Sequence, residues 1–63
     1  MRFRDDDRVT VTDPRDRLYN EKGTVTSWFY GMANRVVYMV QLDVRDDALA
    51  YAEDQLDLGE GAA

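Results

Sequence analysis

Carboxylates are the most numerous side chains in this sequence that could do chemistry. Of its 63 residues, 13 are Asp or Glu and 8 are Lys or Arg, for a formal net charge of −5. Neighbouring acids occur at residues 5–7, 46–47 and 53–54. A pair of carboxyl groups can act as general acid and general base when one of the two pKa values is raised. Adjacent acids in polar stretches are usually solvated, however, so we interpret all three groups as surface charge.

Other catalytic and metal-binding groups are missing. The sequence contains no histidine and no cysteine, which removes the commonest general base, the commonest metal ligand and any thiolate nucleophile. Ser27 is the only serine and has no histidine to take its proton. Residues 5–7 lack the alternate spacing and the glycine of a calcium loop. We therefore predict no enzyme, no cofactor and no metal site.

The elements that would position any site are short strands. In residues 8–12 Val9 and Val11 share one face, the period-two pattern of a half-buried strand. Asp13-Pro14 ends this strand, because proline lacks the amide proton that a ladder needs. The apolar run at 36–40 is typical of a central strand. The whole pattern predicts strands at 8–12, 24–30, 35–42, around 50–51 and at 56–58, with a polar loop at 13–22, a turn at 31–35 and a helical turn at 52–55.

Five short strands in about fifty residues must curl and close to protect their edges. We predict an all-β fold, an SH3-like five-stranded small barrel with one short helical turn before the last strand. Gly23 should serve a positive φ or a close backbone approach. The barrel should span residues 8–58, between a charged N-terminal tail at 1–7 and a frayed C-terminal tail at 59–63. The longest apolar run has five residues, too few for a signal peptide or a membrane span, so we expect a soluble, cytoplasmic protein without membrane insertion.

Three stretches carry a resemblance to a known family. YNEKGTV at 19–25, VQLD at 40–43 and YAEDQL at 51–56 together resemble the small peripheral E subunit of photosystem I, with Tyr51 in place of a phenylalanine. The resemblance spans roughly residues 8–58, although this chain has only one lysine, Lys22. It implies an SH3-like barrel with no chemistry of its own, an accessory subunit that docks through its loops on a larger protein assembly of the photosynthetic or electron-transfer kind.

Alternation along the second and third strands predicts an apolar docking face. Val25, Ser27 and Phe29 should face one side, and Trp28 and Tyr30 the other. On the third strand Tyr38, Val40 and Leu42 should face the core and Val37 and Met39 should face outward. The two outward sets would lie side by side, although Trp28 could instead fold under the long loop as core. With the loop included, the predicted partner-binding residues are Tyr19, Asn20, Glu21, Trp28, Tyr30, Arg35, Val37 and Met39.

Other functions remain open at this stage. A nucleic-acid-associated barrel of the KOW or Tudor type would use Arg15, Arg17, Lys22 and Arg35, with aromatic side chains for stacking. The acids at 13, 16 and 21 lie among these cations, and the acidic chain repels phosphate backbones, so nucleic acid is the less favoured partner. A small phage or mobile-element protein with the same fold, and a homodimer formed through strand edges, are further alternatives.

Overall fold

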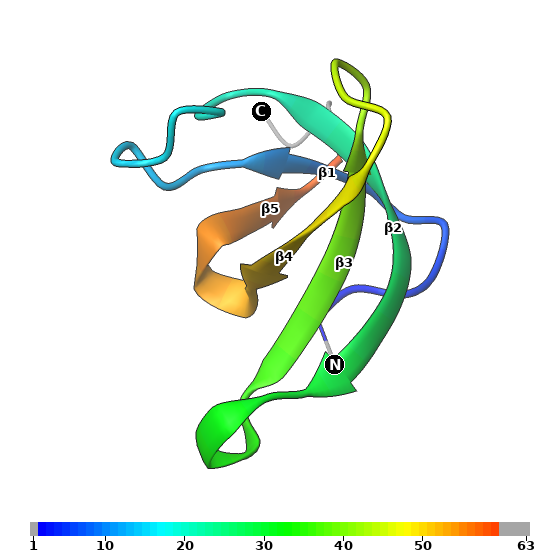
Figure 1. The fold of residues 1–63 in the computed structure, drawn as a ribbon, viewed down its shortest axis with the longest axis vertical. Coiled ribbons are helices and arrows are strands. Elements are labelled where there is room, and N and C mark those ends of the chain that lie inside the picture. The colour runs from blue at the N-terminus through cyan, green and yellow to red at the C-terminus, as the bar shows by residue number, and fades with distance from the viewer. Residues whose placement is uncertain (1, 60–63) are drawn as a thin grey trace.

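The computed structural model describes residues 2–59 and has only β-strands and tight helical turns (Figure 1). Its elements follow the order β1 (Arg8–Val11), β2 (Lys22–Tyr30), η1 (Met32–Asn34), β3 (Val36–Leu42), β4 (Ala48–Ala52), η2 (Glu53–Gln55) and β5 (Leu56–Leu58). The predicted all-β fold, with five strands and one helical turn before the last, is confirmed. The strand ends differ from the predicted ones by a few residues.

The five strands form one antiparallel sheet in the order β4-β3-β2-β1-β5. The sheet curls into a small barrel, with η2 joining the two outermost strands (Figure 1). Side chains that alternate along each strand fill the interior. The buried core consists of Phe3, Val9, Val11, Val25, Tyr38, Val40, Leu42, Tyr51 and Leu56. The predicted inward faces of the first and third strands are therefore confirmed.

Two residues of the long loop and the strand after it have special backbone roles. A Cβ atom on Gly23 would lie 2.6 Å from the Gln41 carbonyl oxygen and 2.9 Å from Leu42 Cα. Gly23 is thus needed because β2 and β3 approach closely there. The positive φ belongs instead to Asn20, at 74°, where the backbone turns so that the Asn20 amide donates to the Val11 carbonyl at 2.7 Å. Asparagine tolerates this conformation better than most residues.

The N-terminal segment is part of the fold, so the prediction of a charged tail at residues 1–7 is wrong for the residues from Phe3 onward. Phe3 is 1% exposed, and its ring packs edge-on against Tyr38 with 5.1 Å between centroids. The Asp6 amide donates to the Val25 carbonyl at 2.7 Å, and the Val25 amide donates to the Asp7 backbone carbonyl at 2.9 Å. Because charged residues surround Phe3 in the sequence, its burial was not predicted. Of the predicted C-terminal tail, Gly59 is also held, since its amide donates to the Arg8 carbonyl, and residues 60–63 lie outside the described range.

A β-bulge in β2 changes which side chains share a face. Val25 is opposite Val40, but the next pair is Ser27 opposite Met39, so Thr26 is an extra residue. Beyond the bulge Trp28 is opposite Tyr38 and Phe29 is opposite Val37. Directly opposite residues lie on the same face of a sheet. The predicted grouping is therefore wrong: Trp28 and Tyr30 lie on the core-facing side, and Phe29 lies on the outer side.

The outer parts of β2 and β3 form a projecting hairpin, which we call the arm (residues 27–37). It extends away from the rest of the barrel to the η1 turn at its tip (Figure 1). The tip is a tight turn in which Ala33 and Asn34 both have φ of 59°, and the Arg35 amide donates to the Met32 carbonyl at 3.2 Å. Positive φ at both central residues is the geometry of a type I′ turn, which prefers Asn-Gly.

Two substitutions in the tip turn should make the fold more stable. Ala33 has no side chain that compensates a left-handed backbone, which costs a non-glycine residue roughly 1–2 kcal/mol. The double substitution Ala33→Asn with Asn34→Gly should raise the free energy of unfolding by about 1 kcal/mol, and hence Tm by about 4–8 °C in a domain of this size. Thermal unfolding followed by circular dichroism measures the change. An unchanged or lower Tm would contradict the assigned turn.

The anchoring role of Phe3 is also testable. Phe3→Ala should destabilise the fold by about 3–5 kcal/mol, because it empties a fully buried site, and a chain of this length has little more stability than that. Urea unfolding of Phe3→Ala and of the exposed neighbour variant Arg4→Ala gives the comparison. Equal stability of the two variants would restore the interpretation of this segment as a tail.

Candidate interaction surface

Large exposed apolar side chains gather on the arm. Seven such residues occur within residues 2–59, and Trp28, Phe29, Tyr30 and Met32 are four of them. Tyr30 is 62% exposed and Met32, at the tip, is 91% exposed. Residues 26–34 contain no charged side chain, although a third of the chain is charged. A contiguous apolar segment of this kind marks an interaction surface.

The core-facing side of the arm presents an aromatic pair. The rings of Trp28 and Tyr30 meet edge to face with 5.3 Å between centroids. Tyr30 is opposite Val36, which is half-buried and packs against the core. β4 pairs with β3 only as far as Val37, so the arm extends past the end of β4. Tyr30 therefore continues the core-facing surface past the end of β4, whereas Trp28 is level with Tyr38 and its β4 partner Tyr51.

Two hollows lie along η2, and the first of them adjoins the arm. The first, of about 340 Å³, is lined by the base of the tip turn and by η2: Asn34, Arg35, Val36, Ala52, Glu53 and Asp54. The second, of about 440 Å³, lies between η2 and the start of the long loop and shares Asp54 with the first. Together they follow η2 from the arm to the loop. An extended segment of another protein could lie along this path.

The acidic residues of η2, Glu53 and Asp54, make one side of this path negatively charged. Glu53 and Asp54 form no ion pair within residues 2–59. Glu53 is half-buried, and its Oε2 accepts from the Tyr38 hydroxyl at 3.5 Å. Arg35 is the one cation that lines the first hollow. The first hollow thus combines an apolar wall, two acids and one base.

The structure divides the eight predicted site residues among three places. Tyr19, Asn20 and Glu21 lie in the loop after β1, at the opposite end of the molecule from the arm tip (Figure 1). Trp28, Tyr30 and Arg35 lie on the arm, where the two aromatic residues share the core-facing side. Val37 and Met39 lie on the outer side and are half-buried. The predicted patch of Trp28, Tyr30, Val37 and Met39 is thus wrong, because the bulge separates its two halves.

The long loop is held by its own acids. The Asp13 carboxylate accepts from the Arg15 amide at 3.0 Å and from Gln55 Nε2 at 3.2 Å, and these two bonds, the Arg15 amide first, hold the pKa of Asp13 below its usual value. The Asp16 carboxylate accepts from the Leu18 amide at 2.8 Å. Desolvation, and then the charge of Asp16, raise the pKa of the buried Tyr51 phenol. These acids shape the loop and fasten it to η2.

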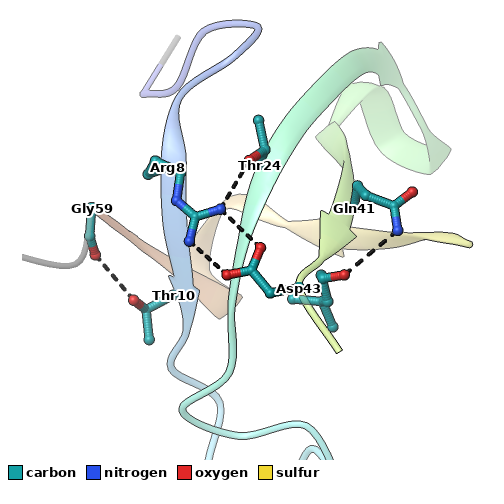
Figure 2. Close-up of polar contacts among 7 residues, drawn as sticks. Arg8, Thr10, Thr24, Gln41, Asp43 and Gly59 are labelled. Carbon is teal, nitrogen blue, oxygen red and sulfur yellow. Dashed lines mark hydrogen bonds and ion pairs between the residues drawn. The ribbon is translucent and has the colours of Figure 1, made fainter. Parts of the chain in front are cut away.

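Several cations are occupied by ion pairs. Arg8 makes a two-pronged contact with Asp43, at 2.9 and 2.7 Å, and donates to Thr24 Oγ1 at 3.0 Å (Figure 2). This contact joins β1, β2 and the end of β3. The hydrogen bonds from Arg8 lower the pKa of Asp43. Arg45 pairs in the same way with Asp47, lowering the pKa of that carboxyl and raising that of the guanidinium.

The cations proposed for nucleic acid do not gather on one surface. Arg15 pairs with Asp13 at 3.2 Å, and Arg15 and Arg17 lie in the loop after β1. Arg35 is at the base of the tip turn, at the other end of the molecule (Figure 1). A phosphate backbone is bound by a stripe of basic side chains. The arrangement of the described residues does not provide such a stripe.

Sequence reasoning missed Phe29, Met32, Val36, Glu53 and Asp54. Alternation carried through Thr26 without a break groups Phe29 with Val25, on the side opposite the predicted outward residues Trp28 and Tyr30. Three consecutive aromatic residues cannot all lie on one face of a strand, so some exposure was readable from 28–30 alone. The position of the bulge was not readable. The two acids reach the arm only because η2 follows β4, which pairs with β3.

Comparisons with protein-family models, with curated proteins and with solved structures give no match to this chain. Within residues 2–59 no three acidic side chains come together in a way that could hold a metal ion. No helix in the same range has the length and apolar character needed to cross a membrane. The resemblance to the photosystem I subunit stays a prediction.

The Arg8–Asp43 contact predicts a pH dependence of stability. The pKa of Asp43 is lowered from 3.8 in the folded state, so the unfolded state binds its proton more readily. The contribution is therefore complete above the unfolded pKa and is lost as the pH falls through the folded pKa. The difference in unfolding free energy between wild type and Asp43→Asn should shrink as the pH falls below about 4.

Urea unfolding between about pH 2 and pH 7 measures this difference. The matched control repeats the substitution in an Arg8→Met background, where the pH-dependent part should disappear. A pH-dependent difference of the same size in both backgrounds would assign the effect to a group other than Arg8.

Proposed function

We propose that this chain is a non-catalytic protein-interaction module, an accessory subunit that docks on a larger protein through the core-facing side of its arm. The docking surface comprises Trp28 and Tyr30 together with the first hollow, which Val36 lines with η2. The exposed aromatic pair on a projecting arm, within a stretch (residues 26–34) that has no charged side chain, is the observation that carries the proposal.

Energetic arguments favour the arm, over the rest of the surface, as the place where a partner binds. Tryptophan and tyrosine contribute more to protein interfaces than most residues, because they combine large apolar area with a polar group. The Trp28 and Tyr30 rings already support each other edge to face, so little side-chain entropy is lost on binding. The loop residues Tyr19–Glu21 are separate from this surface and mainly complete the β1–β2 connection.

The chemistry of the hollow suggests what the partner presents. Its apolar wall suits an aliphatic or aromatic side chain, and the acids of η2 suit a lysine or arginine. The partner segment that we propose is therefore extended, with an apolar residue next to a basic one. This chemistry agrees with a domain that carries a net charge of −5 and has no histidine or cysteine for catalysis.

Affinity capture from the native lysate, carried out in parallel with and without nuclease, tests the proposal. Wild type should retain one stoichiometric protein partner, and Trp28→Ala combined with Tyr30→Ala should reduce the captured amount by about tenfold or more, as expected for loss of central interface aromatics. Tyr19→Ala removes an equally exposed aromatic from the loop and should leave capture unchanged.

Circular dichroism of each variant shows whether the fold survives. Equal capture by wild type and the folded arm variant would place docking elsewhere. Loss of the captured material on nuclease treatment, together with affinity that falls steeply with salt, would assign the module to nucleic acid instead.

A further inference from the structure

The outer edge of β2 along the arm is an unpaired strand edge. β1 pairs with β2 only over Lys22–Thr24, and the turn before β1 is hydrogen-bonded to β2 at Val25. Beyond that point β2 continues through Ser27–Tyr30, paired with β3 on its other side. Within residues 2–59, no strand covers the outer edge of 27–30. An exposed edge of this kind is a template for another strand.

Backbone alternation shows which groups this edge offers. The Gly31 amide donates to the Arg35 carbonyl at 2.7 Å, so the backbone of Gly31 points toward β3. N–H and C=O groups of successive residues point to opposite sides of an extended strand. Phe29 therefore also points toward β3, whereas Trp28 and Tyr30 point their N–H and C=O groups outward. The free edge offers two donors and two acceptors, two residues apart.

We propose that this edge pairs with the same edge of a second copy of the chain, forming a two-fold symmetric dimer. In an antiparallel arrangement, Trp28 of each copy lies opposite Tyr30 of the other, and the two Phe29 residues meet at the axis. This is the only register in which both outward residues of each copy face outward residues of the other, and it makes four backbone hydrogen bonds. It joins the two sheets into one.

Side chains on both faces fit this register. Trp28 and Tyr30 are on the core-facing side of each copy, so each Trp28 lies beside a Tyr30 on that face. Phe29 meets Phe29 on the outer face. Cross-strand aromatic pairs are among the more stabilising pairs in sheets, and a two-fold interface requires this kind of self-complementarity. An unrelated strand would have to supply the same alternation by chance.

Charge also favours a second copy. The arm is uncharged over residues 26–34, so two acidic chains can approach there without like charges in contact. The acidic turn at residues 5–7 lies at one end of the free edge, next to Val25. Arg35 lies at the other end and forms no ion pair within residues 2–59. Antiparallel pairing brings each Arg35 toward the acidic turn of the other copy.

The dimer goes beyond the docking function and does not depend on it. It uses the edge of β2, Phe29 on the outer face and the Trp28–Tyr30 cross-strand pairs on the core-facing side, while the first hollow of each copy remains open on the same side of the joined sheet. A failed docking test therefore leaves the dimer proposal unaffected, and a failed dimer test leaves the docking proposal unaffected. Because the ladder is short, the association should be weak and concentration-dependent.

Sedimentation equilibrium of the wild-type chain from about 10 µM to about 1 mM tests the proposal directly. The apparent mass should rise toward twice 7.3 kDa across that range. Phe29→Lys places two like charges at the axis and should weaken the association by about tenfold or more. Tyr19→Lys, an equal change in the loop, should not. A monomer throughout the range would overturn the proposal.

Disulfide trapping tests the register. The chain has no cysteine, so single substitutions report unambiguously. Phe29→Cys places two thiols at the axis, where Cα atoms are about 4.5 Å apart in such a pair, within disulfide range. Ser27→Cys lies on the same strand and face, but its two copies would be about 13 Å apart. Mild oxidation should cross-link Phe29→Cys and not Ser27→Cys, and equal cross-linking of both would overturn the register.

Discussion

β2 is paired along its whole length with β3 but along only its first part with β1. β1 has four residues and β2 has nine, so the inner half of β2 is central in the sheet and its outer half is not. The same strand thus builds the core through Val25 and projects beyond it through Trp28 and Tyr30. The arm, its exposed aromatic residues and its free edge all follow from this difference in strand length.

The bulge at Thr26 lies where β2 changes from one role to the other. By adding one residue, it turns the next side chains over relative to those before it. Trp28 and Tyr30 then lie on the core-facing side, with Tyr30 past the end of β4, and Phe29 lies on the outer side. Without the bulge, the core-facing side would carry one aromatic residue and the pair would not meet there. One extra residue therefore decides the chemistry of both faces of the arm.

Charge has two different uses in this small domain. Arg8 with Asp43, and Asp13 with Gln55, join segments that are far apart in the sequence. The Arg8–Asp43 contact is exposed, so its value is in fixing geometry more than in adding stability, and the Asp13–Gln55 hydrogen bond is half-buried. Within residues 2–59, Glu53 and Asp54 pair with no cation, and they lie beside the aromatic arm. The distinction between paired and unpaired acids is what separates the structural charges from those available to a partner.

The sequence by itself determined the fold class, because alternation, Asp13-Pro14 and glycine positions are local signals. The inward set Val9, Val11, Tyr38, Val40 and Leu42 was predictable for the same reason: each strand has its own period of two. Phe3 was not predictable, because one apolar residue among charges has no period and its burial depends on Tyr38, which is 35 residues away.

The candidate site was predictable only in part. Aromatic excess at 28–30 marked the correct segment, but not the face on which each ring lies. Only the tertiary structure decided that face, the separation of Tyr19–Glu21 from the arm, and the approach of η2 to Val36. The physical reason is that a bulge forms where two strands pair, and that neighbours across a sheet come from distant segments. Local sequence specifies neither.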